Sequence, residues 1–192
     1  IHKVEINWNE DFNSILKAHP WIKNISSCYL SDINNGGGGA HEYSHAIHLA
    51  LLFRKELLVN TTNTTYNINY KKINNSKYDS KTRVIFRDKC ASVILNINTT
   101  SNPPQKNIKI TGNDGEIFWE RKIENGYEDV KINNGVIFKR RFKITRPDDF
   151  ITQMKYLLDD TKKNSNLSNI KIESAIEVMD ILKEMFKDAK KI

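Results

Sequence analysis

One stretch decides how this chain is read: Gly36-Gly37-Gly38-Gly39-Ala40-His41-Glu42-Tyr43-Ser44-His45-Ala46-Ile47-His48. Four glycines open onto a segment with helical spacing. At about 100° per residue, offsets of four and seven place His41, His45 and His48 along one face of a single helix. We therefore expect three imidazoles to converge there, and they suit either a metal site or a proton-transfer site.

The metal interpretation rests on residues 41–45, which match the H-E-x-x-H pattern. In that pattern two histidines at i and i+4 bind zinc, and the glutamate is the general base of a hydrolase. No G-x-x-H extension follows, and His48 lies about 10 Å further along the helix axis than His41. A zinc-dependent hydrolase with His41, Glu42 and His45 is therefore the alternative hypothesis.

The proton-transfer interpretation needs only one histidine to reach a substrate. An imidazole with a pKa near 7 can take the proton of a hydroxyl group as hydride leaves the same carbon. The glycines would let backbone and ligand approach each other closely at the start of the helix. A structural interpretation also stays open, with His41 and His48 as polar cover and His45 as a buried histidine.

Composition narrows the class of protein. The 192 residues hold 30 Lys plus Arg against 23 Asp plus Glu, a net charge of +7. The lysines are spread along the chain, so we predict no nucleic-acid partner. No apolar run approaches the roughly 20 residues that span a bilayer, so we predict no membrane association. Cys28 and Cys90 are too few for a disulfide framework, which favours a cytoplasmic location.

The chain changes character twice. A strand is expected over residues 3–8, and the histidine helix continues to Phe53. From about residue 56 to 144, alternating apolar residues predict short strands. Turn signals such as Asn134-Gly135 separate them, so the sheet should be mostly antiparallel. The polar segment 67–81 is interpreted as an exposed loop or a strand extension. The alternating positions are Val93, Leu95, Ile97, Ile108, Ile110, Ile117, Trp119, Val136, Phe138, Arg140, Phe142 and Ile144.

Two helices are expected at the end of the chain. Pro147 with the following Asp148 and Asp149 is a good first helical turn. Apolar residues at helical spacing follow in each helix, and the second helix should cover one face of the sheet. The stripes are Phe150, Met154 and Leu157 in the first, and Ala175, Val178, Leu182, Met185 and Ala189 in the second.

Several of these motifs together resemble a known family. The order of His19-Pro20-Trp21, Tyr29, the glycines from Gly36 and Ser44-His45-Ala46-Ile47 is similar to the substrate-binding domain of the Gfo/Idh/MocA oxidoreductases. Residues 110–119 resemble the family's G-x-x-G-x-I-x-W strand-turn-strand block, and residues 150–157 resemble its penultimate helix. The resemblance covers nearly the whole chain.

The resemblance implies an α+β fold, an open and mostly antiparallel sheet with helices packed on one face. Residues 1–192 would be a single C-terminal domain that follows an N-terminal Rossmann domain of the same polypeptide. NAD or NADP would be bound mainly by that other domain, and no G-x-G-x-x-G or Walker loop occurs in this chain. The isolated chain is therefore expected to bind no cofactor and to be inactive.

For the site, the resemblance implies His45 as the acid/base residue, with Tyr29, His41 and His48 binding the substrate. The substrate would be a sugar, a polyol or a nucleotide-sugar derivative. Family members commonly carry Asp at the positions of His41 and His48, so the proton relay differs here. The family also forms subunit contacts through its exposed sheet face, which implies a homo-oligomer through that face, and apolar outward positions would favour it. A non-catalytic binding or oligomerisation module is the third hypothesis.

Overall fold

The computed structural model describes residues 1–57, 63–122, 126–145, 147–163 and 172–187. The described strands are β1 (Lys3–Asn9), β2 (Asn63–Ile73), β3 (Ser76–Arg87), β4 (Ser92–Asn98), β5 (Gln105–Gly112), β6 (Gly115–Lys122), β7 (Tyr127–Asn133) and β8 (Ile137–Lys143). The described helices are α1 (Phe12–Ala18), α2 (Gly39–Glu42), α3 (Ser44–Leu57), α4 (Asp148–Lys163) and α5 (Ile172–Met185), with 3-10 turns at Ile25–Ser27, Tyr29–Ser31 and Ile33–Asn35.

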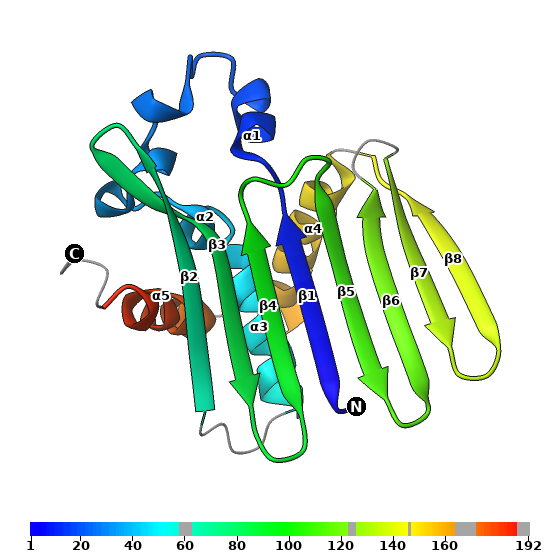
Figure 1. Cartoon of the computed structure of the whole chain (residues 1–192). Helices are drawn as coiled ribbons and strands as arrows, with labels where there is room; N and C mark the ends of the chain where they lie inside the picture. The colour runs from blue at the N-terminus through cyan, green and yellow to red at the C-terminus, as the bar shows by residue number, and fades with distance from the viewer. Residues whose placement is uncertain (58–62, 123–125, 146, 164–171, 188–192) are drawn as a thin grey trace.

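All of these strands belong to one sheet with the order β2-β3-β4-β1-β5-β6-β7-β8 (Figure 1). β1 pairs with β4 in parallel, and every other neighbouring pair is antiparallel. The short connections between consecutive strands allow only antiparallel neighbours, whereas β4 reaches β1 after a long excursion of the chain. Helices α3 and α5 lie on one face of the sheet, behind it in Figure 1. The predicted α+β fold with an open, mostly antiparallel sheet is confirmed.

The segment 67–81 forms a β-hairpin. Asn63–Ile73 pairs with Ser76–Arg87 across β2 and β3, with a register shift at Asn69/Tyr70. The loop interpretation is therefore wrong and the strand extension is right. The polar composition of this segment suggested a loop because β2 is an edge strand, and an edge strand buries few of its side chains.

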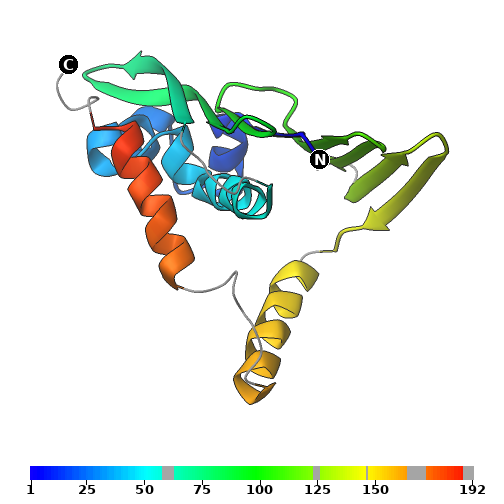
Figure 2. The same cartoon turned by 90° about the horizontal axis from the view of Figure 1, so that it is seen from below.

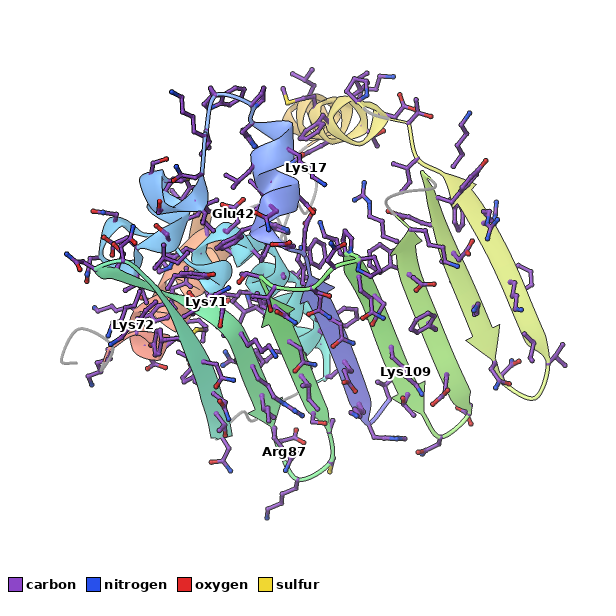
Figure 3. All side chains as sticks on the ribbon, turned by 45° about the horizontal axis from the view of Figure 1, so that its top comes forward. Lys17, Glu42, Lys71, Lys72, Arg87 and Lys109 are labelled. Carbon is purple, nitrogen blue, oxygen red and sulfur yellow. The ribbon has the colours of Figure 1, made fainter. Side chains whose placement is uncertain are left out.

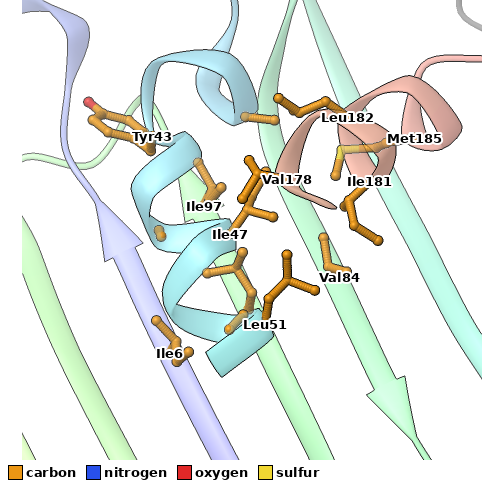
Figure 4. Close-up of a cluster of buried hydrophobic side chains, with 14 of the residues drawn as sticks. Ile6, Tyr43, Ile47, Leu51, Val84, Ile97, Val178, Ile181, Leu182 and Met185 are labelled. Atoms are coloured by element: carbon orange, nitrogen blue, oxygen red, sulfur yellow. The ribbon is translucent and has the colours of Figure 1, made fainter. Parts of the chain in front are cut away.

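The hydrophobic core lies between α3, α5 and one half of the sheet. Ile47 and Leu51 of α3 pack with side chains from β1, β3 and β4, and Val178 and Leu182 of α5 close the cluster (Figure 4). Alternate residues of β4 point to this side: Val93, Leu95 and Ile97 are 0–2% exposed. Burial of this kind stabilises by roughly 25 cal/mol per Å² of apolar surface, so this half of the sheet supplies most of the fold's stability.

Helix α5 confirms the predicted sheet-covering helix with one change. Val178, Leu182 and Met185 are buried as expected, but Ala175 is exposed and Ser174 is buried in its place. The buried face also includes Ile181, which shifts the stripe by one position around the helix. Ala189 lies outside the described residues.

Helix α4 begins directly after Pro147, close to the predicted start, but its apolar stripe is not core. Figure 2 shows α4 standing away from the sheet and from α5. Phe150 and Met154 are each 56% exposed. The side chain of Leu157 lies outside the described part of the chain. Helical spacing shows that a helix has an apolar face, but it does not show whether the same chain covers that face.

The second face of the sheet, turned toward the viewer in Figure 3, carries mostly polar side chains. One row across β4, β1 and β5 is a hydrogen-bonded chain of amides, in which Asn96 donates to Asn7 (2.9 Å) and Asn7 donates to Asn107 (2.9 Å). Lys109 of β5, labelled in Figure 3, lies in the next row and pairs with Glu116. Outward positions of β4 to β8 are therefore mostly polar, and apolar burial does not favour self-association through this face.

Among the described helices, none is long and apolar enough to cross a membrane.

Candidate functional site

The glycine run sets the position of the histidine-bearing segment by close packing. A Cβ on Gly37 would collide with the carbonyl oxygens of Tyr29 and Asp32, and a Cβ on Gly38 would collide with the Asp79 carboxylate. Gly38 also has φ +101°, which L side chains rarely adopt. The close approach that requires glycine is thus made by the protein itself. The expectation that these glycines admit a ligand is not supported.

Asp79 of β3 anchors the start of α2. Its side chain is fully buried, and Oδ2 accepts hydrogen bonds from the Ala40 amide (2.8 Å) and the Thr82 hydroxyl (2.8 Å). Burial raises the pKa of Asp79 to about 6, and these hydrogen bonds oppose that rise. The polar space at the glycine run is therefore filled by a carboxylate, which would repel a cofactor phosphate. The described residues do not fit a dinucleotide there.

The three histidines do not share one continuous helix. Tyr43, with φ −101° and ψ 33°, separates α2 from α3, so His41 lies in α2 while His45 and His48 lie in α3. The predicted convergence of three imidazoles is wrong, because the helix is interrupted where the buried Tyr43 side chain packs against Phe12 (ring centres 6.5 Å apart).

His45 lies in the first turn of α3 against the end of β1. Its ring meets the Trp8 ring edge-on, with 4.9 Å between ring centres, and the Tyr43 ring lies 6.1 Å away. The side chain keeps a solvent-exposed side. Crowding by these neighbours lowers the pKa of His45, the charge of Lys106 lowers it further, and the charge of Glu10 opposes both. The lowered pKa favours the uncharged imidazole, which is the form that can accept a proton.

Lys106 and Glu10 complete the surroundings of His45. The Lys106 Nζ lies 2.7 Å from the Glu10 Oε2 and 5.0 Å from the centre of the Trp8 ring. Sequence reasoning missed Trp8 of β1, Glu10 just after β1, and Lys106 of β5, which meet only through strand pairing. Lys106 could have been found from the sequence, because it faces the same side of the sheet as Ile108, and a lysine at an inward position is unusual.

His41 has a different environment. Its ring stacks on Phe186 (5.1 Å between centres, 11° between planes), and its Nδ1 lies 3.1 Å from the Gly37 carbonyl. Burial lowers the pKa of His41, and the bond to Gly37 opposes this. His41 lines an open pocket of about 490 Å³ with residues of α5, including Leu182 and Lys183. His41 and His45 therefore contact different side chains.

The other predicted substrate contacts are also spread out. His48 is half-buried, and its Nε2 has no hydrogen-bond partner among the described residues. Tyr29 is exposed, and its hydroxyl donates to Glu42 Oε2 (2.9 Å), so burial and this carboxylate raise the pKa of Tyr29 to about 12. Trp21 is 73% exposed beside His19.

A zinc site needs His41, Glu42 and His45 to point at one ion. Within the described ranges, no three His, Cys, Asp or Glu side chains form a group that could hold a metal. Glu42 is bound to Tyr29, His41 is stacked on Phe186, and His45 faces Trp8. The H-E-x-x-H match is a sequence pattern that the local structure does not support.

Comparison with known proteins gives matches in structure only: no family model and no curated protein sequence matches the chain. Aldose-aldose oxidoreductase from Caulobacter crescentus, complexed with glycerol, is similar with a TM-score of 0.69 and 8% identity, over 99% of this chain and 53% of that one. Biliverdin reductase from Synechocystis, with biliverdin and NADP+, is similar with a TM-score of 0.63 and 9% identity, over 97% and 54%.

A 3-ketoreductase from Actinomadura kijaniata, in complex with NADP and TDP-benzene, is similar with a TM-score of 0.56 and 11% identity, over 83% of this chain and 45% of that one. This chain therefore spans about half the length of the proteins it resembles. At these identities the comparisons establish the fold, and the activity has to be argued from the site.

Proposed function

We propose that this chain is the substrate-binding domain of an NAD(P)-dependent oxidoreductase, because it has the fold of the C-terminal domain of Gfo/Idh/MocA-type oxidoreductases. The observation that carries the proposal is the match over almost the whole chain to one half of such enzymes. In this proposal residues 1–192 form one domain, and an N-terminal Rossmann domain of the same polypeptide binds the cofactor. The substrate is a sugar, a polyol or a nucleotide-sugar derivative.

His45 is the proposed acid/base residue. When a secondary alcohol is oxidised, the carbon loses a hydride and the hydroxyl loses a proton, which leaves a carbonyl group. The nicotinamide supplies the hydride acceptor when it is bound. His45 takes the hydroxyl proton, because its pKa is lowered and the ring is uncharged at neutral pH. In the reverse direction the protonated ring returns that proton to the developing alkoxide.

The remaining predicted contacts have unequal support. His48 lies one helical turn after His45, but its unpartnered Nε2 is buried, so it would meet a substrate hydroxyl only after the side chain turned outward. Tyr29 and His41 lie against Glu42 and Phe186, so they would reach only a substrate that extends along α2. Tyr29, His41 and His48 are thus proposed binding residues, and His45 alone has a proposed chemical role.

The test uses the full-length protein and a panel of sugars, polyols and nucleotide sugars, with reduction of NAD+ or NADP+ followed at 340 nm. Loss of a general base slows such reactions by roughly 10²–10⁴-fold, and we expect a loss of this size in kcat for His45→Asn. His19→Asn is the matched control, because His19 hydrogen-bonds the Ile15 carbonyl outside the His45 cluster. Its kcat should stay near that of the unmodified protein.

Two results would contradict the proposal. Turnover of NAD(P)H by the 192-residue chain alone would place a complete active site in it. Unchanged kcat in His45→Asn of an active full-length enzyme would remove His45 from the chemistry. A full-length protein without a cofactor-binding domain would favour the binding-module hypothesis instead.

A further inference from the structure

The ion pair between Lys106 and Glu10 is the most enclosed one in the part of the chain that the structure describes. Its two side chains are only 13% and 17% exposed, and 2.7 Å separates Nζ from Oε2. In the Lys109–Glu116 pair on the other face of the sheet, by comparison, both side chains are more than 40% exposed. An enclosed pair contributes little net stability, because desolvation of two charges offsets most of their attraction. The position of the pair beside His45 therefore says more about its role than its contribution to stability does.

Strand register places this pair. Lys106 of β5 lies opposite Trp8 of β1, and its Nζ sits over the Trp8 ring at 5.0 Å. The same Trp8 ring contacts His45 edge-on at 4.9 Å. Glu10 follows β1 directly, and its backbone carbonyl accepts a hydrogen bond from the Tyr43 hydroxyl (3.2 Å). The ion pair and the His45 imidazole thus lie against the same two residues, Trp8 and Tyr43.

Other charged groups near Trp8 and Tyr43 also have partners. Asp11 accepts a hydrogen bond from the Asn13 amide (3.0 Å), and Glu42 accepts one from the Tyr29 hydroxyl (2.9 Å). Arg121 of β6 lies opposite Lys106, and Glu128 of β7 lies opposite Arg121. Glu128 accepts a hydrogen bond from the Trp119 indole (3.2 Å) and lies 3.7 Å from Arg121. On α3 the neighbouring titratable group is His48. Lys106 and Glu10 are the charges whose fields act on His45.

We propose that Lys106, anchored by Glu10, is a positioning residue that keeps His45 uncharged and ready to accept a proton. Lys106 opposes a second positive charge on the imidazole, and Glu10 fixes the ammonium group and moderates its field. A role of the Lys106–Glu10 pair in catalysis rests on the function proposed above. The effect of the pair on the His45 pKa does not depend on that function, and it can be measured in the 192-residue chain alone.

The experiment is an NMR titration of the histidine imidazole protons between pH 4 and 9, with the His45 signal assigned through its loss in His45→Gln. In Lys106→Met the His45 pKa should rise, because a repelling charge is removed and Glu10 is left unbalanced. In Glu10→Gln it should fall, because the Lys106 charge is no longer moderated. Lys109→Met, which breaks the Lys109–Glu116 pair, is the control and should leave the His45 pKa unchanged.

Opposite shifts of the His45 pKa in Lys106→Met and Glu10→Gln support the proposal, since a loss of packing alone would shift this pKa in the same direction in both variants. Equal pKa values in all variants, or shifts in one direction, overturn it. Glu10→Gln keeps the shape of the side chain, so it decides the matter if Lys106→Met does not fold. In an active full-length enzyme the acidic limb of kcat/KM should move to higher pH in Lys106→Met. An unmoved limb together with a shifted His45 pKa would reject His45 as the base and leave the ion-pair effect intact.

Discussion

The two halves of the sheet differ in what covers them. On the side of β2, β3, β4 and β1, helices α3 and α5 cover one face, and side chains of the inner strands such as Leu95 are 0% exposed. On the side of β6, β7 and β8, the corresponding face stays open: Ile117 is 38% exposed and Phe138 is 54% exposed. Both halves have the same alternating pattern. The difference teaches that alternation identifies a strand but not the element that covers it.

The largest expected effect tests how the covered half holds the histidine segment. Gly37→Ala should destabilise the chain by more than about 4 kcal/mol, because the new Cβ collides with the backbone oxygens of Tyr29 and Asp32. Gly135→Ala in the β7–β8 loop is the control. It meets nothing within 4 Å but has φ +93°, so backbone strain should cost about 1–2 kcal/mol. Urea denaturation monitored by circular dichroism measures both, and equal losses would contradict the close packing at Gly37.

The second prediction compares one apolar strand residue from each half of the sheet. Leu95→Ala should cost about 2–5 kcal/mol, because the side chain is fully buried and leaves a cavity. Ile117→Ala should cost about 1 kcal/mol or less, since the side chain is already 38% exposed. Guanidinium unfolding curves give both values. Similar costs would mean that the open half is covered in solution.

The third prediction concerns the buried Asp79, whose pKa is raised to about 6 from 3.8. The folded state holds the proton more tightly than the unfolded state, so its stabilising contribution is complete below about pH 4 and is lost as the pH rises through about 6. At 1.36 kcal/mol per pH unit the loss is about 3 kcal/mol. We expect unfolding free energies of the unmodified chain to fall by this amount relative to Asp79→Asn between pH 4 and 7. A constant difference would show that Asp79 does not titrate in this range.

The smallest effect is expected in the open half. Arg141 of β8 makes two hydrogen bonds to Asp129 of β7, at 2.7 and 2.8 Å, and the arginine side chain is exposed. Arg141→Gln should shift the denaturation midpoint less than any change above, because solvent screens an exposed pair. The shift should vanish in 1 M NaCl. A large, salt-independent shift would show that this pair is shielded from solvent.

Some of the fold could be predicted because the signals are local. Alternation found β4, β5 and β8, turn residues found the β5–β6 and β7–β8 hairpins, and Pro147 marked the start of α4. The Gly112–Gly115 turn and the sheet-covering role of α5 were also readable. Errors arose where burial depends on distant partners. Ala175 is exposed, Phe150 is 56% exposed, and Tyr43 separates two helices within a segment whose spacing predicted one helix.

The candidate site divides in the same way. The resemblance to the oxidoreductase family predicts His45 as the acid/base residue, and this stays a prediction; its lowered pKa is compatible with a proton acceptor. Trp8, Glu10 and Lys106 were not identified, because their sequence neighbours give no indication that they meet. Glu42 was considered only as part of a zinc motif, whereas it binds Tyr29.

By itself the sequence determined the fold class and the strands and helices with clear periodicity. These depend on residue types within a few positions of one another, so local patterns contain them. The acid/base role of His45 stays a prediction. Tertiary structure decided which glycine packs against which backbone oxygen, which histidines lie in different helices on either side of Tyr43, and which charges surround His45. Those outcomes depend on strand register and helix packing, which bring together residues about 100 positions apart and are set by the free energy of the whole fold.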